Sequence, residues 1–375
     1  MIPFNKPYST GKETVYINDA INRGKLSGNG YYTGACHSFF ELKFGFNKAL
    51  LTSSCTDALE MCALLLDIKL GDEIIMPSYT FVSTANAFAL RGAKIVFADV
   101  AHDVPNLDVT KLGSLITVKT KAIVVTHYGG IATDMHAILS FAVKHQLYVV
   151  EDAAQCIGGT FNGLPLGSIG HLATFSFHET KNIHSGEGGM LVINDKQFEK
   201  RAEVIWEKGT NRAAFFKGEV DSYSWVDLGS SFLPSEITAA FLFAQTESYE
   251  EIVAMRSARW NCYYEQLAPF ANKETFNLIR APDYAVHNCH VFSVVCKDKV
   301  ERDELIATLF KKGFMAVSHY KALHQSPYYK KANIALELPN SIRFEECLVR
   351  LPLFPELEFE AINEICAIVN AFYKK

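Results

Sequence analysis

Residues 121–152, with the sequence KAIVVTHYGGIATDMHAILSFAVKHQLYVVED, decide the fold class. The stretch begins with an apolar run at residues 121–127, which predicts a buried strand. Residues 134–146 have the apolar spacing of a helix, and residues 147–152 form a second apolar run that ends in two acids. Apolar strands separated by a helix predict parallel strands in a sheet that helices cover on both faces.

The same alternation of strand and helix extends over the first two-thirds of the chain. Further strands are predicted at residues 48–52, 72–77 and 93–100, with helical patterns between them. Two more strand candidates, residues 171–178 and 190–195, lie on either side of a glycine-rich loop. We therefore predict an α/β fold with a large, mostly parallel sheet.

A long helical pattern marks the change from a large to a small domain. It covers residues 235–270, and a helix of that length often bridges two packing units. Strand, helix, strand and terminal helix patterns follow it, which predicts a second α/β unit. We predict a large domain at residues 1–250 and a smaller C-terminal α/β domain at residues 251–375.

The composition excludes several classes of protein. A net charge of −5 gives no basis for binding nucleic acid or an anionic membrane. No apolar run approaches the ~18 residues of a membrane span, and the N-terminal residues lack the apolar core of a signal peptide. Nine cysteines without a C-x-x-C pair favour free thiols in a reducing cytoplasm. The histidine pairs 287/290 and 319/324 lack acidic or cysteine partners at metal spacing, so we expect no metal site.

A single lysine stands in the loop between the last two strand candidates. Lys181 lies within FSFHETKNIHSGEGG, residues 175–189, just ahead of the glycines. Most lysines in such loops are simply solvated. The alternative is a lysine held in a pocket, where it acts as a nucleophile that forms a Schiff base. This stretch alone leaves both interpretations open.

Two other positions are typical of ligand sites in α/β proteins. Asp152 ends a buried strand, at the sheet edge where such proteins bind ligands, although Asp152 or Glu151 would equally serve as a helix cap. The run from Ser53 to Thr56 joins a strand to a helix, and the free N–H groups there predict either a phosphate site or an ordinary capping run. Phe81 follows another strand and is either a core residue or a surface for a flat ring.

Together these features describe one cofactor, pyridoxal 5′-phosphate (PLP). PLP requires a lysine for its aldehyde, an acid for its ring nitrogen, a helix start for its phosphate and an apolar wall for its ring. An ionised Asp152 would keep the ring nitrogen protonated, and Lys181 would be the base that moves a proton. The order of the four features along the chain is similar to that in fold-type-I aminotransferases. No motif for a nucleoside triphosphate or a dinucleotide is present.

The chain resembles the DegT/DnrJ/StrS family of sugar-nucleotide aminotransferases over essentially its whole length. Residues 54–100, 175–182 and 207–231 carry the resemblance. Within the family, the chain is most similar to transaminases that form dTDP-4-amino-4,6-dideoxygalactose. The resemblance implies a PLP-dependent enzyme.

The resemblance also implies which residues bind the cofactor. Lys181 would hold PLP through a Schiff base, and Asp152 would pair with the pyridine nitrogen. Gln155 would lie near the ring hydroxyl, and Phe81 would stack on the ring. The phosphate would be bound by Cys55, Thr56 and Ser176.

A homodimer with shared active sites is implied as well. In many relatives a G-x-N-x-R run sends an asparagine to the phosphate in the partner subunit. Here the run is GSSFL at residues 229–233, with Ser231 at the asparagine position and Leu233 at the arginine position. The contact across the dimer through Ser231 is therefore less secure than in those relatives.

The substrate residues have weaker support, because each has a plain structural alternative. The candidates are Glu179 as a contact to the sugar, His184 and Arg212 as contacts to the sugar nucleotide, and His319 and Tyr320 on the substrate side of the small domain. The alternatives are a solvated loop acid, a surface arginine and packing between domains.

The implied reaction is a transamination in two halves. L-Glutamate gives its amino group and leaves as 2-oxoglutarate, and a dTDP-linked 4-keto-6-deoxyhexose receives it. The product would be a dTDP-4-amino-4,6-dideoxyhexose of galacto configuration, for surface glycan synthesis. Two alternatives stay open: a 3-aminotransferase acting on the 3-keto isomer, and a PLP-binding regulator or scaffold without turnover.

Overall fold

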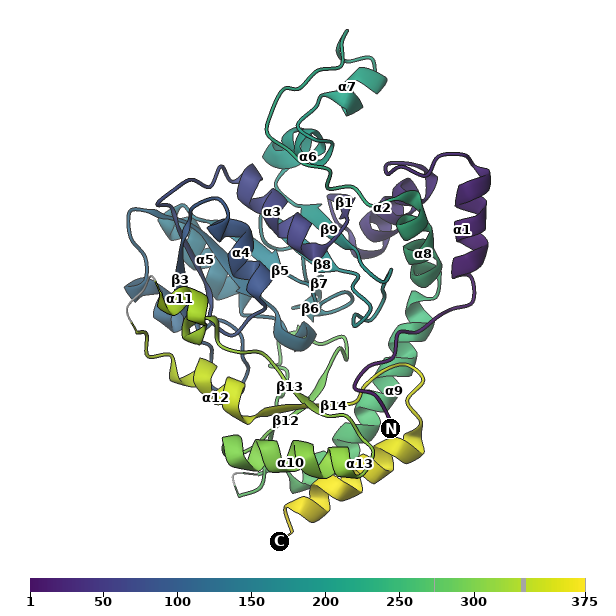
Figure 1. Ribbon diagram of the computed structural model, residues 1–375. Helices are drawn as coiled ribbons and strands as arrows, with labels where there is room; N and C mark the ends of the chain where they lie inside the picture. Colours follow the sequence, from purple (N-terminus) through teal and green to yellow (C-terminus); the bar gives the residue numbers. More distant parts are fainter. Residues whose placement is uncertain (273, 332–334, 375) are drawn as a thin grey trace.

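A seven-stranded sheet forms the centre of the larger part of the molecule (Figure 1). The computed structural model describes residues 1–272, 274–331 and 335–374. The strands, in their order across the sheet, are β1 (Lys48–Thr52), β9 (Gly189–Ile193), β8 (Leu172–Ser176), β5 (Tyr148–Asp152), β4 (Thr120–Thr126), β2 (Glu73–Pro77) and β3 (Lys94–Ala98). All neighbouring pairs from β3 to β8 are parallel, and β9 is antiparallel to both of its neighbours. The predicted α/β fold with a mostly parallel sheet is confirmed.

Helices cover both faces of this sheet, because alternate strand residues point in opposite directions. In β4, Ile123 and Val125 join one apolar core, and Ala122 and Val124 join the other. The first core contains residues of α2 (Tyr31–Phe44), α5 (Met135–His145) and α8 (Glu236–Glu247). The second contains residues of α3 (Cys55–Leu65), α4 (Val82–Ala89) and α6 (Glu199–Trp206). Helix α1 (Glu13–Asn22) packs against α8.

The parallel strands β2, β4, β5 and β8 all end at one edge of the sheet, which is where α/β proteins bind ligands. Strand β1 ends there too, because β9 is antiparallel to both β1 and β8. Helices α3 and α4 begin directly after β1 and β2. The fold therefore gathers the starts of two helices and the ends of several strands along one line.

A smaller, antiparallel sheet lies below this edge (Figure 1). Its strands are β10 (Asn277–Leu278), β12 (Phe292–Val295), β14 (Leu348–Leu351) and β13 (Val317–Ser318). A separate apolar core joins it to α9 (Tyr249–Leu267), α10 (Lys299–Lys311) and α13 (Phe359–Phe372). The N-terminal residues also lie along this sheet, since Ile2 pairs with Phe314. The division at residue 250 stays a prediction.

The long helical pattern at residues 235–270 consists of two helices. Helix α8 ends at Glu247, α9 begins at Tyr249, and Ser248 between them leaves helical geometry with φ −102° and ψ 13°. Shorter elements are β6 (Thr160–Phe161), β7 (Leu164–Pro165), β11 (Ala285–Val286), α7 (Arg212–Phe216), α11 (Pro327–Lys330) and α12 (Pro339–Cys347). Within the described parts of the chain, no helix has both the length and the apolar character needed to cross a lipid bilayer.

Candidate active site

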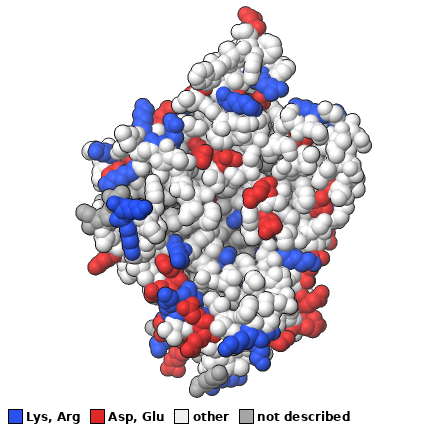
Figure 2. Space-filling view, in the orientation of Figure 1, with Lys and Arg blue, Asp and Glu red and all other residues white. Residues whose placement is uncertain are grey.

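A cavity of about 540 Å³ lies between the ligand-binding edge of the large sheet and the small sheet. Its lining comes from the starts of α3 and α4, the end of β5, the loop between β8 and β9, and strands of the small sheet. Figure 2 shows a hollow near the middle of this face with cationic side chains visible inside it. Lys181 and Arg350 are the lysine and arginine among the described lining residues.

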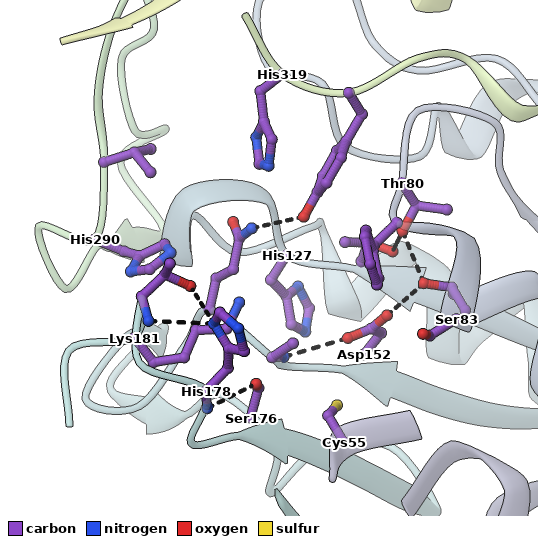
Figure 3. Close-up of a pocket in the computed structure, with 18 of the residues that line it drawn as sticks. Cys55, Thr80, Ser83, His127, Asp152, Ser176, His178, Lys181, His290 and His319 are labelled. Carbon is purple, nitrogen blue, oxygen red and sulfur yellow. Dashed lines mark hydrogen bonds between the residues drawn. The ribbon is translucent and has the colours of Figure 1, made fainter. Parts of the chain in front are cut away.

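Lys181 points into this cavity from the loop between β8 and β9 (Figure 3). Ser185 N–H donates to the carbonyl of Phe177, and Glu179 N–H donates to that of Gly186, which has φ +78°. These bonds close the loop tightly. Burial lowers the pKa of Lys181, although the neighbouring Cys55 and Asp152 act in the opposite direction. Among the described residues its amine has no hydrogen-bond or ion-pair partner.

Asp152 enters the cavity from the end of β5. Its Oδ2 accepts a hydrogen bond of 2.6 Å from the Thr84 hydroxyl, and its Oδ1 accepts one of 3.3 Å from Ala154 N–H. The Thr84 hydroxyl is in turn hydrogen-bonded to Thr80. Burial raises the pKa of Asp152, and the Thr84 bond partly offsets this. A cation placed beside this carboxylate would stabilise its charged form.

Glu151, the other acid at this strand end, points away from the cavity. It is fully buried and accepts hydrogen bonds from the N–H groups of Gly167, Ile169 and Gly170 at 2.9, 2.8 and 2.5 Å. It also lies 3.0 Å from Nε2 of His127, whose Nδ1 accepts from Thr133 N–H. Burial alone would raise the pKa of Glu151, but His127 and the N–H groups lower it. Glu151 therefore holds the loop at residues 167–170, which leaves Asp152 as the acid facing the cavity.

The start of α3 offers unpaired N–H groups to the cavity. The Ser54 hydroxyl caps the helix by accepting from Asp57 N–H at 3.1 Å. In the described structure the N–H groups of Cys55 and Thr56 have no hydrogen-bond partner. The Thr56 hydroxyl donates to Ser83 at 2.8 Å, so a second hydroxyl lies beside it. Such a helix start is suited to a phosphate group.

Strand β9 passes this helix start without a side chain in between. A Cβ atom at Gly189 would lie 2.3 Å from the carbonyl carbon of Ser54 and 2.4 Å from the nitrogen of Cys55. Glycine is therefore required for the backbones to approach this closely.

An aromatic wall faces the strand ends. The Phe81 side chain is 54% exposed, and its ring lies 6.1 Å from that of Tyr320. The Tyr320 hydroxyl accepts from Gln155 Nε2 at 2.9 Å, and Gln155 Oε1 accepts from Gly129 N–H at 2.7 Å. His319 Nδ1 is hydrogen-bonded to the Tyr128 hydroxyl at 3.0 Å. These bonds join the small sheet to the large one across the cavity.

A match to the DegT/DnrJ/EryC1/StrS aminotransferase family covers residues 7–370. The chain belongs to this family. The predicted family and enzyme class, an aminotransferase, are thereby confirmed.

Two relatives are each 29% identical to this DegT-family chain. They are the GDP-perosamine synthase of Escherichia coli O157:H7, over 99% of this chain and 98% of the relative, and the spore coat polysaccharide biosynthesis protein SpsC of Bacillus subtilis (strain 168), over 100% and 97%. A structure of the putative sugar aminotransferase Spr1654 from Streptococcus pneumoniae, described as its PMP form, has a TM-score of 0.93 at 24% identity. The similarity covers 100% of this chain and 99% of that one, which shows a shared fold.

Nine of the thirteen predicted site residues of this aminotransferase line the cavity. They are Cys55, Thr56, Phe81, Asp152, Gln155, Ser176, Lys181, His319 and Tyr320. The wall of the large sheet holds the residues predicted for the cofactor, and His319 and Tyr320 lie on the opposite wall.

The other four predicted residues do not line the cavity of their own chain. Ser231 and Glu179 are exposed. His184 is buried and donates from Nε2 to the carbonyl of Tyr8 at 2.9 Å. Arg212 lies 3.5 Å from Glu207 in a separate hollow beside α6 and α7. Their roles stay predictions, and the role of Ser231 depends on a second copy of the chain.

The sequence analysis missed several lining residues of this family member. Thr80 and Thr84 had a recognisable signal, since both hydroxyls lie in the segment that directly follows strand β2, at the edge of the sheet where ligands bind. His290 donates from Nδ1 to Asn182 Oδ1 at 2.9 Å, and in the sequence it stands out only as half of a histidine pair. Arg350 lies in β14 within an apolar run, and Phe4 comes from the N-terminal residues. Only the tertiary fold brings these last two residues to the cavity.

Proposed function

We propose that this protein is a PLP-dependent sugar-nucleotide aminotransferase that uses L-glutamate to aminate a dTDP-linked 4-keto-6-deoxyhexose. The single observation that carries the proposal is the meeting of Lys181, Asp152 and the start of α3 in one cavity. The product is a dTDP-4-amino-4,6-dideoxyhexose of galacto configuration, for use in surface glycans.

The residues of the cavity fit pyridoxal 5′-phosphate. Lys181 would hold the cofactor covalently, and Asp152 would pair with its ring nitrogen. The free N–H groups of Cys55 and Thr56 would bind the phosphate together with Ser176, and Phe81 would cover the ring. Asp152 lacks an ion-pair partner among the described residues, which supports a cationic ligand beside it. When bound, the cofactor supplies an electron sink for a carbanion on the substrate carbon.

Lys181 and Asp152 then carry out the proton chemistry of the reaction. Burial lowers the pKa of Lys181, which enlarges the share of neutral amine at neutral pH. This amine takes the proton from Cα of the donor and returns one to C4 of the sugar. The hydrogen bonds from Thr84 and Ala154 favour the ionised form of Asp152, and the positive charge of the ring nitrogen would favour it further. Leu351 and Leu353 add apolar surface to the lining of the cavity.

A homodimer with shared active sites is part of the proposal. Residues 212–231 form an arm that projects from the body beyond α6 (Figure 1). Exposed apolar side chains gather on this arm: Phe215, Phe216, Val220, Tyr223, Trp225, Val226 and Leu228. A patch of this kind marks a protein interface, and a second copy of the chain is the expected partner. Light scattering should give a dimer, and a fully active monomer would contradict the proposal.

The cytoplasm is the proposed location. All nine cysteines are free thiols, and seven of them are buried. This pattern is typical of a reducing compartment.

The substrate is tested by product analysis. Protein reconstituted with PLP is incubated with L-glutamate and dTDP-4-keto-6-deoxyglucose, and the product is identified by NMR. The expected product carries its new amino group at C4, and the Lys181→Ala variant serves as the inactive control. A 3-amino product from the 3-keto isomer, with the 4-keto compound inert, would overturn the regiochemistry. Turnover with the GDP-linked sugar alone would overturn the proposal that the nucleotide is dTDP. GDP is the second candidate because one relative is a GDP-perosamine synthase.

A further inference from the structure

His290 is a buried histidine whose two ring nitrogens have different surroundings. The residue is 6% exposed and lines the active-site cavity just ahead of β12 (Figure 3). Its Nδ1 lies 2.9 Å from Oδ1 of Asn182. Its Nε2 has no hydrogen-bond partner among the described residues. One nitrogen is therefore used by the fold, and the other is left for the cavity.

The hydrogen bonds of Asn182 determine which nitrogen of His290 carries the proton. Asn182 Nδ2 donates to the carbonyl of Asn288 at 2.8 Å, so Oδ1 is the atom that faces the ring. An amide oxygen can only accept, so Nδ1 carries the proton and Nε2 has a lone pair. Burial lowers the pKa of His290 well below its ordinary value, and the charge of Lys181 adds to this effect. The ring is therefore neutral at neutral pH, and its Nε2 acts only as an acceptor.

Helix α9 holds the backbone that carries His290. Arg256, which is 1% exposed, donates from Nε to the carbonyl of Cys289 at 3.2 Å and from Nη2 to that of His290 at 2.6 Å. Trp260 Nε1 donates to the carbonyl of Val291 at 3.0 Å. Three consecutive carbonyl groups are thus fixed by side chains of one helix. A polar group held this firmly at the wall of a cavity is suited to recognising a ligand.

The described residues do not supply a donor for Nε2 of His290. The amine of Lys181 has no hydrogen-bond partner, and the hydroxyl of Tyr320 is bonded to Gln155 instead. A buried acceptor without a partner is unfavourable. The N–H or O–H group that pairs with Nε2 therefore belongs to a ligand of the cavity.

Of the two proposed substrates, the sugar has a matching group. The carboxylates of an amino-acid donor are acceptors, which do not pair with a lone pair, and its amino group is the reacting group itself. A 4-keto-6-deoxyhexose has free hydroxyls at C2 and C3. The C3 hydroxyl is on the carbon next to C4, where Lys181 acts. His290 lies near this lysine, because its ring is bonded to Asn182, the next residue in the chain.

We propose that Nε2 of His290 accepts a hydrogen bond from the C3 hydroxyl of the sugar substrate, beside the carbonyl group that is aminated. The inference rests on the proposed aminotransferase function and adds a determinant of its specificity. It assigns His290 to the sugar half of the reaction alone. The residue should favour a sugar that has the C3 hydroxyl over one that lacks it, and should leave the amino-acid half unchanged.

The test uses two substitutions that each keep the role of one ring nitrogen. His290→Gln can place an amide oxygen near the position of Nε2, whereas His290→Asn reaches only as far as Nδ1 and keeps the bond to Asn182. His102→Gln is the exposed control. Single-turnover rates of the sugar half are measured on protein loaded with pyridoxamine phosphate, with dTDP-4-keto-6-deoxyglucose and with its 3-deoxy analogue. The amino-acid half is measured on PLP-loaded protein with L-glutamate.

The expected result is a loss of discrimination that is confined to the sugar half. Wild type and His102→Gln should prefer the sugar with the C3 hydroxyl roughly 10- to 100-fold in kcat/KM. In His290→Asn the two sugars should react within about 3-fold of each other, and His290→Gln should keep part of the preference. The glutamate half should stay within about 3-fold of wild type in both variants.

A binding measurement keeps the inference separate from the proposed function. The ligand dTDP-6-deoxygalactose has no ketone and cannot react, and it should raise the melting temperature of wild type more than its 3-deoxy analogue does. In His290→Asn the two ligands should give equal shifts. If wild type aminates no sugar, the proposed function fails, and the difference between the two shifts still decides the contact to C3.

Three outcomes would overturn the inference. The first is a wild type that does not distinguish the two sugars in rate or in binding. The second is a His290→Asn protein that keeps the wild-type preference, which would show that Nε2 bonds only to water. The third is an equal loss in the glutamate half and the sugar half, which would give His290 a purely structural role.

Discussion

The two walls of the cavity differ in how far one charged side chain on each, Asp152 or Arg350, is already hydrogen-bonded. On the wall of the large sheet, Asp152 accepts two hydrogen bonds, and Thr56 is bonded to Ser83. On the wall of the small sheet, Arg350 has a buried Nε with no partner in the described chain. A resident cofactor suits the first wall, because its site must be preorganised. A substrate that comes and goes suits the second, because it supplies the missing partner itself.

Lys181 lies between the two walls, so its removal should have the largest effect. Lys181→Ala should lose the covalent bond to the cofactor and at least about 10³-fold of the turnover, because it lacks both nucleophile and base. Lys181→Arg should fail equally, since a guanidinium is too basic for either role. Borohydride reduction followed by peptide mapping should label Lys181 in wild type. Label on any other lysine would show that the site has been wrongly assigned.

Asp152→Asn should have the next largest effect, and it tests the large-sheet wall. The amide cannot hold a proton on the ring nitrogen by charge. Loss of such a buried ionic partner is expected to cost about 3–5 kcal/mol in the transition state, or roughly a hundred- to several-thousand-fold in rate. Rates should be measured at saturating cofactor, so that weaker binding is not mistaken for slower chemistry. A variant with near-native turnover would show that another group holds the nitrogen.

The two walls also differ in how much the sequence could predict. Groups on the large-sheet wall directly follow apolar strands, so the strand pattern indicated the run from Ser53 to Thr56, Phe81 and Asp152 as candidate ligand positions, and the family resemblance supplied their roles. The small-sheet wall is built from segments far apart in the chain. Arg350 lies in a run where its neighbours predict only a core strand, and nothing local indicates that β14 faces the cavity.

The sequence also cannot decide which of the two neighbouring acids, Glu151 or Asp152, faces the ligand. Alternation along a strand predicts that the two side chains point to opposite faces. The alternation does not show which of the two side chains faces the ligand, because this depends on how segments further along the chain pack around the strand end. The structure decides the question through partners: Glu151 is bonded to the loop at residues 167–170, and Asp152 faces the cavity.

Glu151→Gln is therefore the matched control for Asp152→Asn. We expect it to destabilise the fold by about 2–4 kcal/mol, because an amide matches three N–H donors poorly. The rate of the folded fraction should change little. Urea unfolding measures the stability, and single-turnover rates measure the chemistry. A Glu151→Gln protein with native stability but slow chemistry would reverse the roles of the two acids.

The pH dependence of this control follows from the pKa of Glu151. Its pKa is lowered in the folded state, so the stability it contributes is present above the ordinary value of 4.5 and is lost as the pH falls through the folded value. Glu151→Gln should therefore lose more stability at pH 7 than at strongly acidic pH. An equal loss at both pH values would show that the charge of Glu151 is not the cause.

Thr84→Val should have the smallest effect, and it tests whether the Thr84 hydrogen bond lowers the pKa of Asp152. The Thr84 hydroxyl donates to Asp152 at 2.6 Å and partly offsets the rise in pKa that burial causes. Removing this bond should cost about 1–2 kcal/mol, or roughly tenfold in rate, and should raise the pKa of Asp152 further. The acid limb of the pH–rate profile should then move to higher pH, because Asp152 becomes ionised, and so able to hold the ring nitrogen, only at higher pH.

Thr84→Ser is the control for this variant. It keeps the hydroxyl, so the acid limb of its pH–rate profile should lie at the same pH as in wild type. If the valine and serine variants share one profile, the Thr84 bond does not tune Asp152, and the charge on the ring nitrogen alone must keep it ionised.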